Sequence, residues 1–330
     1  MMARAGLRIG VVGATGTLGT ELLELLDLSS LRVSEIIPIA TESSLGRDIE
    51  FQGSLFPLKT EKAGLAGLDL LFLCAPPSAA LEFVRSALRE HVPCIDLSGA
   101  TAGTEDVPMR VAGYGSVPED IPLLAIPRSP ALALVMALQP IAAAVGLKRV
   151  SGTVLESASF AGKDGMAALY QESIAIFSQQ SQPETTVFPG PVAFDCLSGA
   201  EGLDAEGLAP RESALIRDLA LLLGGEVKIA TTLVQVPVFA GLGAALSIET
   251  ERDLEVGETE DLLRKAPGVE LAADSDSAPT TRTVVGRDSV LVGRLRSDPS
   301  VERGLQLWLV ADPLRLAASH AIQLAVLRLA

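Results

Sequence analysis

Histidine is scarce in this sequence of 330 residues, with only two copies, His91 and His320. Cysteine occurs three times, at Cys74, Cys94 and Cys196, and without paired spacing. So few imidazoles and thiols argue against a metal site of the usual ligand types. Three separated cysteines also argue against a disulfide framework and fit a reducing compartment.

Basic residues are outnumbered as well, 26 against 41 acidic ones, which gives a formal net charge of -15. No basic cluster interrupts this excess, so nucleic acid is not an expected partner. The most apolar long segment, residues 130–147, is divided by Pro130, Gln139 and Pro140, which favours a buried helix over a membrane span. The residues before the first apolar run do not form a secretory signal, and we expect a cytoplasmic protein.

Hydrophobic residues make up 48% of the chain, enough for the cores of two domains. Apolar runs at 7–12, 36–40, 68–75 and 93–97 alternate with helical patterns, which predicts a doubly wound parallel sheet. After Val150 the sequence pattern changes, with a strand-like stretch, a helical stretch and a polar, proline-bearing stretch. We expect a second domain that starts before this change, near Ile126. It should contain helices at 165–180 and 210–223, a surface loop at 272–283, and a mixed or antiparallel sheet with strands at 151–159, 231–239, 244–249, 290–296 and 305–310. A last helix is expected at 313–329.

A glycine-rich turn, GATGTLG, connects the first predicted strand to the first predicted helix. Gly13, Gly16 and Gly19 let the backbone turn sharply and approach a pyrophosphate, and the helix N-terminus offers free N–H donors to an anion. The spacing is looser than the dinucleotide fingerprint, so the strand and helix around it carry much of the argument.

Four runs resemble motifs of the aspartate-semialdehyde dehydrogenase family, in that family's order. GATGTLG resembles GATGxVG, PVAFDCL resembles IAFNxLP, PTTRTVVGRDSVLVGRLR resembles PTxRDVxGxDEVxVGRIR, and GLQLWLVADPLR resembles GLxLWxVxDNLR. The resemblance implies a Rossmann-like nucleotide-binding domain at 1–125 plus 312–330. It also implies an α+β, glyceraldehyde-3-phosphate-dehydrogenase-like domain for catalysis and dimerisation at 126–311, and a homodimer.

The family's chemistry runs through a thioester on a cysteine, with a histidine as acid and base. In the segment that resembles the family's ANPNCST, this chain has AIPRSPA, which puts Ser129 at the cysteine. In the segment that resembles RVPVLRGH it has QVPVFAGL, which puts Leu242 at the histidine and Gln235 at the substrate-carboxylate arginine. The family's phosphate-binding arginine would fall near Ala102, where the sequence has no arginine. These replacements predict a catalytically inactive protein, similar to the family's divergent Usg-type branch.

Glu156 matches the glutamine that assists the family's nucleophile. One alternative is that Ser129 and Glu156 form a new hydrolytic or acyl-transfer pair. The other is that both are satisfied polar residues in a relic pocket. Cys196, in an apolar stretch, is expected to be a small buried residue, and Trp308 is expected to pack in a strand.

Cofactor binding is the second departure from the family. The family segment with an arginine for the 2'-phosphate of NADP is here Thr41-Glu42-Ser43-Ser44, which adds a carboxylate. The family's SAGGS is here Cys74-Ala75-Pro76-Pro77-Ser78, and proline has no N–H to offer. Any NADP would be held by the residues that match the family's nucleotide site, namely Gly13, Thr15, Gly16, Thr17, Leu18, Ser43 and Ser44.

Three functions remain open at this stage. The first is an inactive homologue that serves as a dimeric binding or regulatory protein. The second is an active NADP-dependent dehydrogenase of amino-acid biosynthesis, or an enzyme with an altered substrate on the same fold. The third is a partner that forms heterodimers with an active relative.

Overall fold

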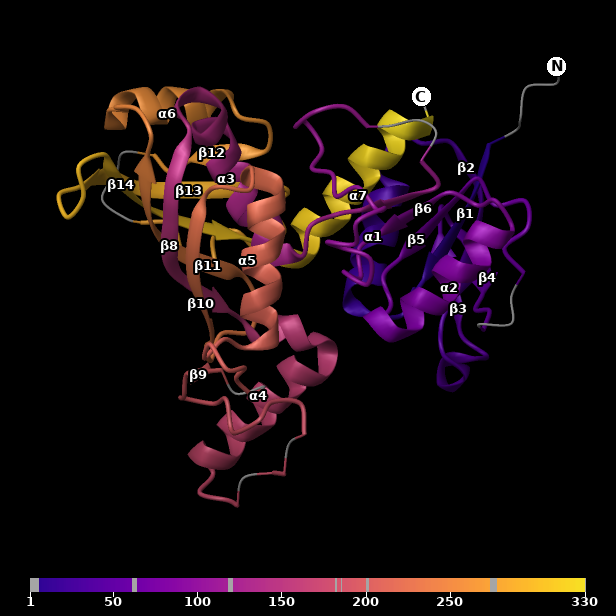
Figure 1. The fold of residues 1–330 in the computed structure, drawn as a ribbon. Helices are drawn as coiled ribbons and strands as arrows, with labels where there is room; N and C mark the ends of the chain where they lie inside the picture. Colours follow the sequence, from indigo (N-terminus) through magenta and orange to yellow (C-terminus); the bar gives the residue numbers. More distant parts are fainter. Residues whose placement is uncertain are drawn as a thin grey trace. The chain divides into compact units, whose positions relative to one another are not determined.

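The computed structural model forms two compact units (Figure 1). Unit 1 comprises Met1–Arg128 and Ala317–Ala330, and unit 2 comprises Ser129–Leu316. The structure describes residues 6–60, 64–117, 121–181, 183–184, 186–199, 202–273 and 278–329. No helix in these ranges is both long enough and apolar enough to cross a bilayer.

Unit 1 is built around a five-stranded parallel sheet with the strand order β2-β1-β5-β6-β7. The order reverses at β1, which has β2 on one side and β5 on the other. This sheet confirms the predicted doubly wound parallel fold, whose ligands bind at the carboxyl ends of strands beside such a reversal. The elements are β1 (Leu7–Val12), α1 (Thr17–Asp27), β2 (Val33–Ile39), η1 (Glu42–Ser44), β5 (Leu70–Leu73), α2 (Pro77–Arg89), β6 (Cys94–Asp96), β7 (Leu123–Ala125) and the last part of α7 (Pro313–Leu329).

Unit 1 also has a short hairpin that the sequence pattern did not predict, formed by β3 (Asp48–Phe51) and β4 (Ser54–Pro57). Gln52 and Gly53 connect the strands with φ values of 49° and 71°. Two successive residues with positive φ form the tight turn that suits the twist of a two-residue hairpin. The strands are short and largely exposed, so their hydrophobic pattern is weak.

Unit 2 contains a seven-stranded mixed sheet with the order β12-β13-β14-β11-β8-β10-β9. Strands β8 and β10 are parallel, whereas β11 pairs antiparallel with both β8 and β14. Helices α3, α5 and α6 pack against strands of this sheet (Figure 1). The elements are α3 (Ser129–Val145), β8 (Leu147–Glu156), η2 (Ala158–Ala161), α4 (Gly162–Phe177), β9 (Leu197–Ser198), α5 (Pro210–Leu223), β10 (Lys228–Gln235), β11 (Leu242–Thr250), α6 (Val256–Lys265), β12 (Val269–Leu271), β13 (Val290–Asp298) and β14 (Gly304–Ala311).

Several predicted elements end at different residues in the structure. The strand expected at 151–159 stops at Glu156, and the strand expected at 231–239 stops at Gln235. Both strands stop at the same level because their last residues are partners in the sheet. The buried helix expected at 130–147 is α3, which continues through Pro140 as far as Val145. The predicted loop at 272–283 lies partly outside the described residues.

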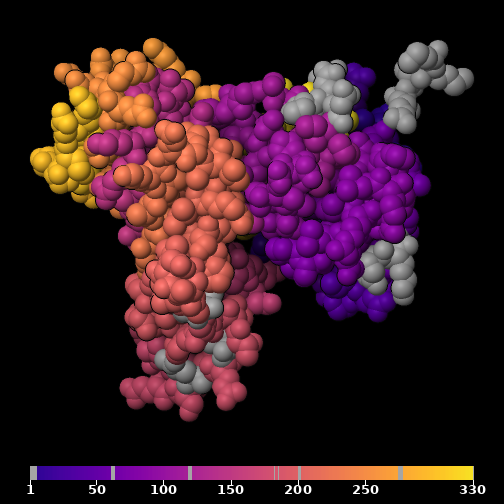
Figure 2. Space-filling model, in the orientation of Figure 1, coloured from indigo at the N-terminus to yellow at the C-terminus, as the bar shows by residue number. Residues whose placement is uncertain are grey.

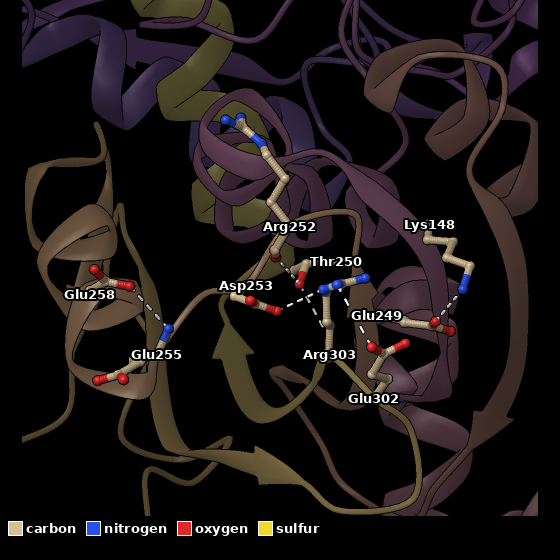
Figure 3. Close-up of polar contacts among 9 residues, drawn as sticks. All are labelled: Lys148, Glu249, Thr250, Arg252, Asp253, Glu255, Glu258, Glu302 and Arg303. Carbon is tan, nitrogen blue, oxygen red and sulfur yellow. Dashed lines mark hydrogen bonds and ion pairs between the residues drawn. The ribbon is translucent and has the colours of Figure 1, made fainter.

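A network of charged side chains occupies one end of the unit 2 sheet (Figure 3). Arg303 pairs with Asp253 at 2.7 Å and Glu302 at 3.7 Å, and Lys148 pairs with Glu249 at 2.5 Å. Glu249 lies near the end of β11, opposite the end that begins at Leu242. The charged side chains therefore lie at the end of the sheet opposite Glu156 and Leu242.

Candidate functional site

Three of the predicted site residues form one row across adjacent strands of unit 2. Glu156 at the end of β8 is the sheet partner of both Gln235 on β10 and Leu242 on β11. Side chains of directly opposed residues project from the same face of a sheet. The register therefore brings these three positions together at one edge of the sheet.

Ser129 lies at the same end of unit 2. It is the first residue of α3, and its hydroxyl donates a 3.2 Å hydrogen bond to the carbonyl oxygen of Pro313. Pro313 closely follows Ala311, which is the sheet partner of Leu242 on its other side. A helix N-terminus stabilises negative charge and would lower the pKa of a thiol there, but a hydroxyl bonded to a carbonyl gains no comparable reactivity.

Glu156 is buried, and its carboxylate pairs with the guanidinium of Arg211 at 2.6 Å. The Arg211 guanidinium also lies 5.6 Å from the ring centre of Phe160. Arg211 is near the start of α5, a predicted helix in which no sequence signal connects this arginine with the site. The carboxylate of Glu156 is therefore the counter-ion of an arginine, and Ser129 donates its hydroxyl hydrogen elsewhere.

The side-chain amide of Gln235 donates its hydrogen bonds to the backbone. Its Nε2 donates to the backbone carbonyl of Glu156 at 2.9 Å and to that of Val236 at 3.2 Å. Leu242, the third member of the row, is completely buried. Position 235 thus fixes the backbone of Glu156, and position 242 contributes a hydrocarbon to the core.

Unit 2 contains one cysteine and no histidine, because His91 and His320 both fall in unit 1. Our expectation that Cys196 is buried was wrong, because this residue is exposed. It follows Phe194, which has a φ of 64°, and precedes the outermost strand β9. Only Val192 and Ala193 in this apolar stretch turn inward, where their N–H groups donate to the buried Glu172 carboxylate at 2.7 and 2.9 Å.

The two thiols of unit 1 are poor nucleophiles. Cys94 is buried in β6, and burial raises its pKa to about 12. Burial also raises the pKa of Cys74, which follows β5. Both side chains therefore stay in the thiol form near neutral pH.

The glycine-rich turn of unit 1 leads from β1 directly into α1. Gly13 has a φ of 82°, and a Cβ atom there would come within 2.7 Å of the backbone nitrogen of Ala75. Gly16 is the N-cap of α1, and because glycine has no side chain it leaves the first N–H groups of the helix without a side-chain cap. Thr17 and Leu18 open α1, so their N–H groups belong to the helix end that attracts anions.

The other two predicted nucleotide segments lie at the same edge of the unit 1 sheet. Residues 41–44 follow β2, residues 74–78 follow β5, and both strands pair with β1. Ser43 and Thr41 share a 2.9 Å hydrogen bond, and Ser44 is buried. Pro76 is the N-cap of α2 and Pro77 its first residue, so neither can donate a backbone N–H to a ligand.

Comparisons with known proteins agree with this architecture. Residues 8–115 match the family model "Semialdehyde dehydrogenase, NAD binding domain", and residues 138–316 match "Semialdehyde dehydrogenase, dimerisation domain". The chain is 30% identical to the aspartate-semialdehyde dehydrogenase of Aquifex aeolicus over 98% of both chains. It is also 30% identical to that of Rickettsia bellii over 96% of both chains. The chain belongs to the aspartate-semialdehyde dehydrogenase family.

Solved structures of the family have the same fold. Aspartate semialdehyde dehydrogenase II of Vibrio cholerae superposes with a TM-score of 0.91 at 28% identity, over 98% of both chains. The same enzyme complexed with ASA gives a TM-score of 0.92 at 27% identity, over 99% of both chains. The Candida albicans enzyme with NADP is 18% identical and has a TM-score of 0.74 over 98% of both chains, a likeness of fold alone.

Some of the family-like motifs hold unit 2 together. Asp312 accepts hydrogen bonds from the N–H of Gly286 at 2.8 Å and of Leu314 at 3.1 Å. Trp308 donates to the carbonyl of Pro279 at 2.7 Å, which agrees with a role in strand packing. The PTTRTVVGRDS and ADPLR segments are therefore bound to each other.

Arg128 is a second arginine whose surroundings the sequence did not reveal. Its guanidinium donates to the carbonyl of Gly99 at 2.9 Å and to that of Ala102 at 3.4 Å. The Arg128 guanidinium thus lies beside the loop around Ala102, the position that matches the family's phosphate-binding arginine. No sequence pattern connects Arg128 with a loop so far before it in the chain.

Proposed function

We propose that this protein is a catalytically inactive homologue of aspartate-semialdehyde dehydrogenase, of the Usg type, which acts as a dimeric binding or regulatory protein. The observation that carries the proposal is the makeup of unit 2, which has no histidine and whose one cysteine, Cys196, is exposed beside the edge strand β9. Acyl transfer to sulfur needs a thiolate and an imidazole in contact.

The other residues of the site support the same conclusion. Ser129 would need a base to act as a nucleophile, but its hydroxyl donates to the Pro313 carbonyl and the Glu156 carboxylate is paired with Arg211. Removing one member of a catalytic unit costs about four or more powers of ten in rate. Loss of both nucleophile and acid-base leaves no route to useful turnover.

For the nucleotide, we propose a site that has lost its preference for NADP. The Gly13 turn and the uncapped start of α1 suit a pyrophosphate. Glu42, in the short helix after β2, would repel a 2'-phosphate, whereas a carboxylate there suits a free ribose hydroxyl. If a dinucleotide binds, its nicotinamide would supply hydride chemistry, but unit 2 lacks the thiol and imidazole that chemistry requires.

An active dehydrogenase is the second candidate. It is supported by the identity of 30% over 98% of the chain to a protein that carries that name. An enzyme with an altered substrate on the same fold would also be consistent with this similarity. Fold similarity alone does not establish either activity.

Two proteins test the proposal, the wild type and the Ser129→Cys variant. Each is incubated with aspartate semialdehyde, phosphate and NADP or NAD, and nicotinamide reduction is followed by absorbance. We expect no turnover from either protein, because the new thiol would still lack an acid-base partner. The Aquifex aeolicus relative serves as the positive control. Turnover by the wild type would overturn the proposal, and turnover by Ser129→Cys alone would show that Leu242 is not the acid-base position.

A further inference from the structure

Unit 1 has a cavity of about 250 Å³ between α1 and β3. We propose that this cavity binds an aliphatic polyamine, a molecule with several ammonium groups along a methylene chain. The inference is independent of the proposed function, because the cavity shares no residue with the family's matched positions. The residues that line it are Ala14, Thr20, Leu23, Glu24, Asp27, Asp48, Ile49, Glu50 and Phe51.

The two walls of the cavity come from a helix and a strand that lie against each other. On α1 the lining residues are three, four and seven positions apart, so they share one face of the helix. On β3, Asp48 and Glu50 are two positions apart, so their side chains leave the strand on the same side, about 7 Å from each other. Glu24 and Asp27 contribute two carboxylates from the helix wall, and β3 contributes two from the strand wall.

These four carboxylates are available to a ligand. Glu24, Asp27, Asp48 and Glu50 are all exposed. None of them has an ion-pair partner among the residues that the structure describes. The walls therefore carry negative charge that a cation from solvent can reach, and they disfavour an anion.

The spacing of the carboxylates decides which kind of cation fits. No group of three or more histidine, cysteine, aspartate or glutamate side chains in the described ranges could hold a metal ion. The carboxylates therefore do not converge on one point, as ligands of a single metal ion must. A cation whose charges are several ångströms apart can instead pair with both walls at once.

The interior of the cavity favours a hydrocarbon chain between those charges. Ala14, Leu23 and Phe51 are 0%, 6% and 4% exposed and line the cavity with apolar surface. Methylene groups gain free energy when they leave water for such a surface. The volume is below the roughly 300–1,000 Å³ of sites for drug-sized molecules, which favours a slender ligand.

The test is a calorimetric titration of the full-length protein with spermidine, at an ionic strength of about 0.15 M that screens the net charge of the chain. We expect a dissociation constant on the order of millimolar. The double variant Glu24→Gln, Glu50→Gln, which removes one carboxylate from each wall, should bind spermidine at least about threefold more weakly.

The matched control is the double variant Glu82→Gln, Glu90→Gln. It removes two exposed carboxylates of unit 1 that do not line the cavity, so the net charge changes by the same amount. This variant should bind spermidine within about 1.5-fold of the wild type. Hexaamminecobalt(III), a compact cation of the same charge as spermidine, should bind the wild type at least about threefold more weakly, because it has no methylene chain.

Three results would each overturn the inference. The first is that spermidine does not bind the wild type, and the second is that both double variants bind it equally well. The third is that hexaamminecobalt(III) binds as tightly as spermidine, which would mean attraction by charge alone. Failure of the spermidine titration would leave the proposed function intact, because the turnover assay tests residues of unit 2.

Discussion

At the scale of single residues, two thiols with raised pKa values, the buried Cys94 and the half-buried Cys74, make the stability of the protein sensitive to alkaline pH. Burial raises the pKa of Cys94 to about 12 and also raises that of Cys74. In the unfolded chain a thiol ionises near pH 8.5. The folded state therefore keeps protons that the unfolded state loses, and this stabilising contribution is present below the unfolded pKa and disappears as pH rises towards the folded pKa.

We expect the free energy of unfolding to fall between about pH 8.5 and pH 10.5, with a contribution of about 1.4 kcal/mol per pH unit from the buried thiol of Cys94. The Cys94→Ala variant should have a shallower dependence, even though loss of the side chain costs about 1 kcal/mol at neutral pH. Urea denaturation at a series of pH values measures both effects. Cys196→Ala, which changes an exposed thiol, should keep the wild-type slope, and an unchanged slope in Cys94→Ala would contradict the assignment.

The exposure of Cys196 could not be predicted from the apolar residues next to it in the sequence. The stretch PVAFDCL is apolar, but its burial depends on Glu172, a residue of α4 that binds only the N–H groups of Val192 and Ala193. In the same way, the pairing of Arg211 with Glu156 joins residues 55 positions apart. Neither contact leaves a periodic signal in the sequence.

Among the elements, α5 depends on one buried carboxylate at its start. Glu212 accepts hydrogen bonds from Ala209 within its own first turn and from Leu233 on β10, so it both caps the helix and fixes it to the sheet. Glu258 on α6 makes only the capping half of this arrangement, with the N–H of Glu255 at 3.1 Å, and it is exposed (Figure 3).

Glu212→Gln should lower the free energy of unfolding by about 1–3 kcal/mol, because an amide can accept only one of the two hydrogen bonds and leaves a buried N–H unsatisfied. Glu258→Gln is the control and should cost less than about 0.5 kcal/mol, since water replaces its contact. Chemical denaturation of the two variants compares them directly. Equal losses would mean that the bond from Glu212 to β10 contributes nothing.

Local signals predicted some elements well and others poorly, for physical reasons. The bounds of α5 and α7 follow from Pro210 and Pro313 at their starts, since proline suits the first helical position. The end of β10 could not be predicted from the local sequence, because residues 236–239 are as apolar as the strand itself. The strand ends where its pairing with β8 ends. The row of Gln235, Glu156 and Leu242 required that register and was not predictable from spacing alone.

At the scale of the whole molecule, an exposed apolar face on α4 is the best candidate for the contact between two copies. Tyr170, Ile174 and Phe177 recur at helical spacing and are 58%, 42% and 76% exposed. Phe194, 62% exposed, packs edge-on against Phe177 at 5.5 Å. These residues lie in the part of unit 2 that matches the dimerisation model and that forms its lower lobe in Figure 2.

We therefore expect a homodimer whose dissociation constant rises at least about tenfold in the Phe177→Asp variant, because a carboxylate would be desolvated at the contact. Leu28→Asp is the control, since Leu28 is 79% exposed but belongs to unit 1. Sedimentation velocity over a range of concentrations measures both variants. A dimer unaffected by Phe177→Asp would place the contact between copies elsewhere.

Under the proposed function, the pairing of Glu156 with Arg211 limits how the family's catalytic residues could be introduced into this chain. An arginine introduced at position 235 and a histidine introduced at position 242 would flank a carboxylate that already has one guanidinium at 2.6 Å. One buried negative charge cannot compensate several neighbouring positive ones, so each reversion would be unstable while Arg211 remains. These two substitutions would therefore have to be accompanied by a change at Arg211, and either of them made alone should lower the stability of the protein.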